Sequence, residues 1–175
     1  MIDSRLKDLV AATVLLAAAT GAWAQNQPHV SLDAEKLGPR PIEQLTGTNI
    51  VQNYALAWRD LANALSQNRP ELLNEQFIGF AKDQFRERIS AQSHSGLHVE
   101  IRDQGHRLKA VFYSLDGGIM QLIDDAQIET KVFDGRNLIY SDNAPRRYLV
   151  LMTPGADRWY IRSMQSQPGP ASSSF

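Results

Sequence analysis

The sequence predicts an α+β fold in which N-terminal helices pack against an antiparallel sheet built from the second half of the chain. The first observation is an apolar residue at every third or fourth position over residues 50–65, the period of an amphipathic helix. The second is a series of extended segments within residues 97–165. Glycine and proline separate these segments, as expected for the turns of an antiparallel sheet.

The N-terminus carries the pattern of an export signal. Arg5 and Lys7 precede an apolar run over residues 9–22, and Ala22-Trp23-Ala24 matches the small-x-small pattern of a signal peptidase site. The apolar stretch of about 16 residues is shorter than the ~20 needed to cross a bilayer. We therefore expect residues 1–24 to be a cleaved signal peptide and the protein to be periplasmic or secreted, from a bacterium, without membrane contact after cleavage. An uncleaved membrane anchor is the alternative.

Composition excludes several classes of function. The formal net charge is −1 and the calculated pI is about 6.4, so a basic surface for nucleic acid is not expected. The chain has no cysteine, which removes disulfides, thiolate metal sites and cysteine nucleophiles. It also lacks a glycine-rich phosphate loop and a serine nucleophile elbow. We expect no cofactor and no metal.

The helical part follows a polar segment. Residues 25–45 contain three prolines and predict a linker, or an arm laid over the domain. A hydroxyl of Thr46 or Thr48 is then available as the N-cap of the long helix, which should end near Asn68 because Pro70 cannot continue it. The apolar stripe changes phase at Gly79, which predicts a short helix near 70–78 and a longer one near 79–92.

The strands account for the rest of the predicted domain, residues 46–165. Alternation in the third extended segment places Met120, Leu122, Ala126 and Ile128 on one face and mainly polar residues on the other, so one face should cover a core. Residues 166–175 are rich in proline and serine and predict a disordered tail. The five extended segments are residues 97–103, 107–114, 119–133, 147–153 and 159–165.

This order of elements resembles the NTF2-like superfamily, the SnoaL and ketosteroid-isomerase-like cone fold, also described as cystatin-like. The resemblance implies that the helices lie in the concave face of a curved antiparallel sheet, with a pocket at the open end of the cone. It implies a pocket lined by Tyr54, Trp58, Leu122 and Tyr148 in an exported member of unknown activity. The residues that carry the resemblance are the stripe through Trp58, Leu61 and Leu65, then Phe77, Phe133-Asp134-Gly135 and Asp157-Arg158-Trp159-Tyr160-Ile161.

Asp124 and Tyr113 are the candidate catalytic residues. Strict alternation places Asp124 among apolar neighbours, where a carboxyl group has a raised pKa and can act as a general acid or base. A bulge that turns Asp124 and Asp125 toward water is the favoured alternative. Tyr113 has the hydroxyl that an oxyanion partner requires, although a wall residue explains it as well. The family's isomerases need a second acid, and its epoxide hydrolases an acid–arginine–acid set. Neither pattern is matched.

Two further groups have alternative readings. His98, Glu100 and His106 include zinc-ligand types, but surface histidines are favoured over a metal site. Three arginines could bind an anionic group, but surface pairing with Asp142 or Asp157 is favoured. These arginines are Arg146, Arg147 and Arg162.

The favoured function is a binding or assembly module that takes a small apolar molecule or a protein or peptide partner at the open end of the cone. One alternative is a structural domain that pairs through the outer face of the sheet as a homodimer. The other is a pocket enzyme of isomerase, lyase or hydrolase type that uses Asp124 and Tyr113. A binding module is favoured over an enzyme.

Overall fold

The computed structural model describes residues 28–168. The predicted signal peptide and residues 169–175 of the predicted tail lie outside the described residues. Ser166 and Gln167, which were also predicted as tail, belong to the last strand. The elements in chain order are strand β1 (Val30–Asp33), helix α1 (Gln44–Gln67), the 3-10 helix η1 (Pro70–Leu73), helix α2 (Gly79–His94), and strands β2 (Leu97–Tyr113), β3 (Met120–Asp134), β4 (Asn137–Pro154) and β5 (Trp159–Gln167).

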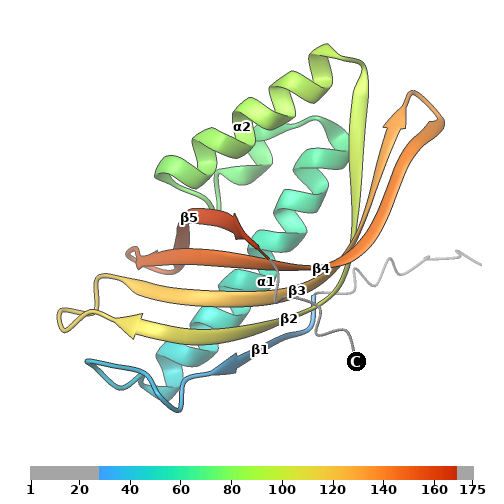
Figure 1. The fold of residues 1–175 in the computed structure, drawn as a ribbon. Coiled ribbons are helices and arrows are strands. Elements are labelled where there is room, and N and C mark those ends of the chain that lie inside the picture. The colour runs from blue at the N-terminus through green and yellow to red at the C-terminus, as the bar shows by residue number, and fades with distance from the viewer. Residues whose placement is uncertain (1–27, 169–175) are drawn as a thin grey trace, which may run out of the picture.

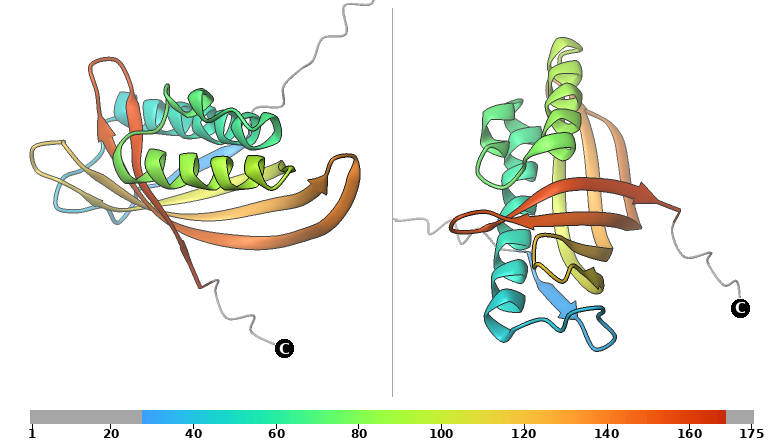
Figure 2. Two further views of the ribbon diagram at one scale, coloured as in Figure 1. Left: turned by 90° about the horizontal axis from the view of Figure 1, so that it is seen from above. Right: turned by 90° about the vertical axis from the view of Figure 1, so that its left-hand side faces the viewer.

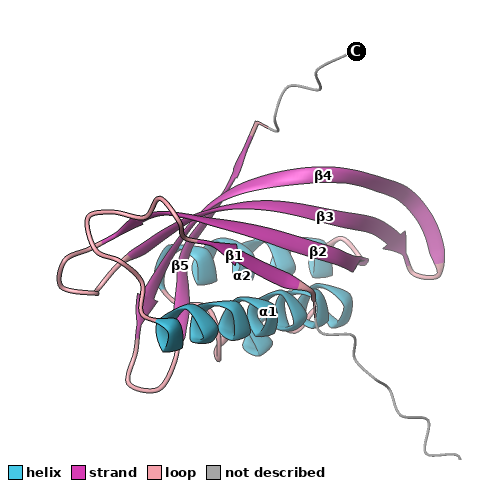
Figure 3. Ribbon diagram, turned by 90° about the horizontal axis from the view of Figure 1, so that it is seen from below, coloured by secondary structure: helices cyan, strands magenta, loops and turns pink. Residues whose placement is uncertain are grey.

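The strands form one sheet in the order β1-β2-β3-β4-β5. Strands β2 to β5 are antiparallel neighbours, whereas β1 runs parallel to β2. The sheet is curved, and α1 and α2 lie together on its concave side (Figures 1 and 3). The views in Figure 2 show the long strands wrapping around α1. The predicted fold class, α+β with helices in the concave face of a curved antiparallel sheet, is confirmed.

Helix α1 buries the predicted stripe but begins earlier than predicted. Its N-cap is Glu43, and the Thr48 hydroxyl donates a hydrogen bond of 3.0 Å to the Gln44 carbonyl oxygen inside the first turns, so the predicted hydroxyl cap is wrong. The predicted end is confirmed, because Asn68 has a left-handed conformation with φ 54° and closes the helix. The joint at Gly79 is also confirmed: this glycine has φ 52° and starts α2.

Three parts of the sheet differ from prediction. The segments predicted at residues 97–103 and 107–114 form one continuous strand, β2, which has a register shift near Gly105 instead of a turn. The segment predicted as a linker, residues 25–45, includes β1, which pairs with His106 to Lys109 of β2 and acts as an arm on the sheet edge. Strand β4 begins ten residues before the predicted segment 147–153, because its N-terminal half is mostly exposed and lacks the alternation that marks a half-buried strand. The folded region therefore extends beyond residues 46–165.

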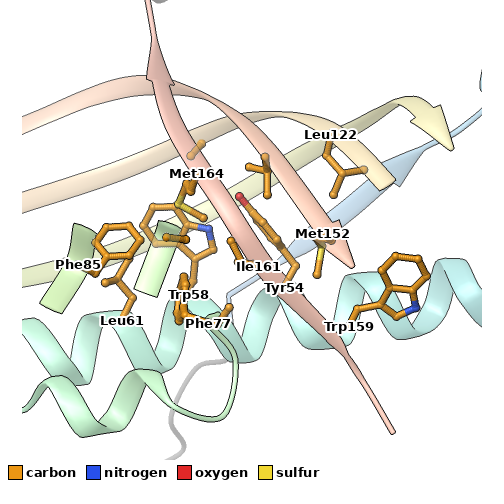
Figure 4. Close-up of a cluster of buried hydrophobic side chains, with 14 of the residues drawn as sticks. Tyr54, Trp58, Leu61, Phe77, Phe85, Leu122, Met152, Trp159, Ile161 and Met164 are labelled. Carbon is orange, nitrogen blue, oxygen red and sulfur yellow. The ribbon is translucent and has the colours of Figure 1, made fainter. Parts of the chain in front are cut away.

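The core lies between α1 and the concave face of the sheet. Figure 4 shows Tyr54 and Trp58 projecting from α1 toward the strands, among Leu122, Met152 and Met164. Such close packing contributes about 1.5–3 kcal/mol for each large apolar side chain that leaves water. No helix in residues 28–168 combines the length and the apolar character that crossing a bilayer requires.

Candidate functional site

A bulge in β2 positions the polar residues of the interior. Before the bulge the odd-numbered residues Val99 and Ile101 face the helices, and after it the even-numbered residues do so as far as Ala110, where a second register shift follows. The register shift lies between Asp103 and Gly105, where Gly105 has φ 136°, a conformation that favours glycine. Two residues only three apart, Asp103 and His106, therefore both turn toward the interior.

These residues join Asp124 and Tyr54 in a buried polar cluster. The His106 Nδ1 atom lies 2.8 Å from Asp124 Oδ2, and the Tyr54 hydroxyl donates to the same oxygen over 2.8 Å. On the other side of the ring, His106 Nε2 lies 2.7 Å from Asp103 Oδ2. Exposure is 0% for Asp124 and Tyr54 and 2% for His106. Each ring nitrogen faces a carboxyl oxygen, so this geometry favours the protonated imidazole, in which both nitrogens donate.

The protonation states follow from burial and charge. Burial by itself lowers the pKa of His106, but the hydrogen bonds and charges of Asp103 and Asp124 outweigh it and raise this pKa to about 9. Burial, reinforced by the charge of Asp124, raises the pKa of Tyr54 well above its ordinary value. At neutral pH the cluster therefore holds an imidazolium between two carboxyl groups and a neutral phenol.

Aromatic rings enclose this cluster. The Trp58 ring lies 4.6 Å from the His106 ring between centroids and 5.5 Å from the Tyr148 ring. Among the buried atoms of residues 28–168 that have no hydrogen-bond partner are Asp124 Oδ1, in the cluster, and Trp58 Nε1, in the ring beside it. One is a free acceptor and the other a free donor. Leaving a buried polar group of this kind without a partner lowers the stability of the fold by about 1–3 kcal/mol.

The favoured interpretation of Asp124 as a bulged, solvent-facing residue is wrong. The pairing of β3 with β2 and β4 runs without a shift through Asp124 and Asp125, so the alternation holds and the two side chains face opposite sides. Asp124 faces inward to His106 and Tyr54, while Asp125 faces outward to Arg147. The partners that stabilise the buried carboxylate are 18 and 70 residues away, too distant to leave a local signal.

The structure does not bring Tyr113 to Asp124. Tyr113 pairs with Met120, four residues along β3 from Asp124, which corresponds to ~13 Å at 3.3 Å per residue. Its ring packs against Trp159 at 6.2 Å and lies beneath the Arg40 guanidinium at 5.0 Å. Tyr113 is therefore a wall residue at another part of the core.

The predicted pocket-lining residues lie around Asp124. Tyr148 is its register partner on β4, and Leu122 precedes it by two residues on the same face. Tyr54 and Trp58 reach this place from α1 (Figure 4). Their side chains pack against one another and against the cluster. Three depressions on the described part of the surface, with volumes of about 400–470 Å³, are lined by residues other than these four.

The candidate metal ligands are separated by the bulge in β2. His98 and Glu100 lie on the outer face, where His98 stacks on Phe133 at 5.0 Å, whereas His106 lies inside. The expectation of surface histidines is thus wrong for His106. The sequence signal for this arrangement is Gly105, between the segments predicted at 97–103 and 107–114: a glycine there predicts a turn, but a glycine inside a strand also signals a bulge.

The three arginines do not converge. Arg146 pairs with Asp142, as favoured from the sequence, and Arg147 faces the opposite side and binds Asp125. Asp157 pairs with Arg158 rather than with one of the predicted arginines. The acid–arginine–acid set built on Asp124 and Arg147 is also excluded, because these side chains lie on opposite faces of the sheet.

A second surface of interest is the edge of β4. Strand β5 pairs with residues 147–154 of β4, and within the described chain residues 137–146 have a strand neighbour only in β3. Figure 1 shows this part of β4 continuing past β5 into the upturned hairpin. Three large apolar side chains are exposed there: Leu138 at 52%, Ile139 at 57% and Tyr140 at 53%.

Comparison with solved structures supports the fold. The intermembrane space region of the chloroplast protein ARC6 matches with a TM-score of 0.60 and 17% identity over 73% of this chain and 98% of that chain. An NTF2-like family protein from Streptomyces avermitilis matches with a TM-score of 0.48 and 11% identity, over 71% of this chain and 99% of that chain. A domain with a cystatin-like fold from Nostoc punctiforme matches with a TM-score of 0.41 and 11% identity, over 72% of this chain and 78% of that chain. No protein-family model matches the sequence, and no characterised protein matches it significantly.

The chain shares an α+β fold with that ARC6 region. Its long helix lies within a curved sheet of four antiparallel strands, which a short parallel strand extends at one edge. The α+β architecture that the resemblance implied, helices in the concave face of a curved antiparallel sheet, is confirmed. Because this fold supports many unrelated activities, function must come from the surfaces and residues described above.

Proposed function

We propose that this protein is an exported binding module that takes an extended segment of a partner protein as an additional strand on β4. The observation that carries the proposal is the edge at residues 137–146, which has one strand neighbour within residues 28–168 and three exposed apolar side chains. We refer to residues 137–146 as the β4 edge.

The backbone of the β4 edge supports this mode of binding. An edge strand presents a row of N–H and C=O groups that an extended peptide satisfies by continuing the sheet. Proteins commonly blunt such edges with lysines, prolines or bulges. The β4 edge has no lysine, but it has a register shift at Ile139 and one proline, Pro145, near its end. Between these two positions residues 140–144 keep their N–H donors.

The side chains indicate what the partner segment contains. Leu138 pairs with Phe133, and Tyr140 pairs with Val132 across a register shift, so Leu138 and Tyr140 lie on opposite faces of the hairpin. A partner strand rich in apolar, β-branched residues would cover both, because cross-strand apolar pairs each contribute roughly 0.2–1 kcal/mol.

The interior gives less support to the other candidates. The residues expected to line a small-molecule pocket are packed around a hydrogen-bonded cluster, and Asp124 is itself fully buried. An enzyme built on Asp124 and Tyr113 requires two groups that the register separates. The cluster is better suited to holding α1 against β2 and β3.

A peptide selection tests this function. Residues 25–175 are immobilised, and peptides that bind them are selected from a displayed random library. We expect the double variant Leu138→Ser, Tyr140→Ser to lower the affinity for the selected peptides at least tenfold, as measured by fluorescence anisotropy. The matched control is Leu115→Ser combined with Ile119→Ser, which removes exposed apolar side chains from the other end of the sheet and should leave affinity unchanged.

Hydrogen exchange locates the bound peptide independently. Amides of residues 137–146 should gain protection when a selected peptide binds. Protection elsewhere, or equal affinity in the Leu138/Tyr140 and control variants, would contradict strand addition. If a second copy of the chain occupies the edge, sedimentation would show a dimer that the Leu138/Tyr140 variant loses.

Export has a separate test. Expression of the full chain in a bacterial host should yield a periplasmic or secreted protein whose first residue, by mass spectrometry, is Gln25. Ala22→Asp should block processing, because the site requires a small residue there, whereas Ala18→Ser should not. A wild-type protein that keeps residues 1–24 and sediments with membranes would instead indicate an anchor.

A further inference from the structure

The outer face of the sheet, opposite the helices, has a depression of about 440 Å³. Its origin is a row of three residues in register across β2, β3 and β4: Gly105, Gln127 and Pro145. Gly105 has no side chain and that of Pro145 is short, so the surface is low along this row. The lining residues are His29, Gln104, Gly105, His106, Arg107, Asp125, Ala126, Gln127, Pro145, Arg146 and Arg147.

The next row across the same strands carries the charge. Arg107, Asp125 and Arg147 are in register and all face outward. The Nε and Nη2 atoms of Arg147 donate to the two oxygens of Asp125 over 2.7 and 2.9 Å. This bidentate pair fixes Arg147 against the wall of the depression, because two parallel hydrogen bonds restrict the guanidinium to one plane.

Arg107 supplies positive charge that the row does not neutralise. The hydrogen bond from Arg147 lowers the pKa of Asp125, and the charges of Arg147 and Arg107 lower it further, so Arg107 lies within electrostatic range of the carboxylate. Arg107 is exposed and has no ion-pair partner among residues 28–168. The row therefore holds two guanidinium groups for one carboxylate, and exposed His29 lies at the rim.

We propose that this depression binds a small molecule through a carboxylate or phosphate group, held by the guanidinium of Arg107. A planar guanidinium matches the two oxygens of either group, and the excess of one positive charge in the row favours an anion. The volume falls within the usual range for small-molecule sites, about 300–1,000 Å³. Strand addition at the β4 edge does not depend on this site, and the two proposals can fail separately.

The proposal is tested by NMR titration of the wild-type protein at constant ionic strength. Inorganic phosphate is added in one titration and acetate in another. We expect saturable shifts in the amides of residues 104–107, 125–127 and 145–147 with at least one of the two anions. Comparison of the two anions identifies the preferred group. Arg107→Gln should weaken binding at least tenfold.

Two further variants control for general charge effects. Arg136→Gln removes the same charge from the exposed β3–β4 turn and should change affinity less than twofold. Asp125→Asn removes the only carboxylate of the row and should strengthen binding severalfold. Absence of saturable shifts with both anions, or equal weakening by Arg107→Gln and Arg136→Gln, would overturn the proposal.

Discussion

Replacement of Asp124 by alanine should lower the free energy of unfolding by about 3–5 kcal/mol, the range seen when one member of a buried ion pair is removed. The carboxylate accepts from the Tyr54 hydroxyl and from His106 Nδ1 inside a core that excludes water. Its loss leaves the buried His106 ring with Asp103 as its one carboxyl partner, and it removes the acceptor of the Tyr54 hydroxyl. Urea denaturation followed by tryptophan fluorescence measures the change.

Asp125 provides the matched control for this prediction. It is the neighbouring residue on β3 and also has an ion-pair partner, but both side chains of the Asp125–Arg147 pair remain about one third exposed. Asp125→Ala should therefore cost no more than about 1 kcal/mol. Equal losses for the two alanine variants would mean that the buried cluster does not stabilise the fold.

The second large effect is a loss of stability at alkaline pH. The pKa of His106 is raised from 6.5 to about 9 in the folded protein, so folding binds this proton more tightly. Below about pH 6.5 both folded and unfolded chains carry the proton, and the stabilisation is complete. It declines as pH rises and is lost through pH 9, with a total of about 3 kcal/mol.

The free energy of unfolding, measured between pH 6 and 9.5, checks this expectation. His106→Gln should be less stable at pH 6 and should show a much flatter profile, because the titrating group is gone. His98→Gln, which alters a histidine on the outer face, should keep the wild-type profile. A wild-type profile that is flat over this interval would show that His106 is not held protonated.

Sequence patterns predicted the helices and the fold class because those patterns are local. The stripe from Ile50 to Leu65 defines the buried face of α1, and Pro70 prevents its continuation past Asn68. Gly79 separates the second helical region at the predicted joint. In each case the residues that determine the conformation lie within one or two helical turns of it.

The polar interior could be predicted only in part. Alternation along β3 placed Asp124 on the apolar face, but nothing near it in sequence indicated that His106 and Tyr54 would satisfy its carboxylate. Without such partners burial is costly, so a solvent-facing bulge was the reasonable expectation. The actual bulge lies in β2 at Gly105, where it brings Asp103 and His106 to the same face.

By itself, the sequence determined the helices, most of the extended segments and the α+β architecture, together with an expectation of export. Only the tertiary structure decided that the carboxylate of Asp124 is buried, that Tyr113 is remote from it, and that the β4 edge and the outer depression are the available surfaces. The physical reason is the range of the forces involved. Backbone conformation follows from neighbours a few residues apart, whereas a buried charge is stabilised by partners that only folding brings within hydrogen-bond distance.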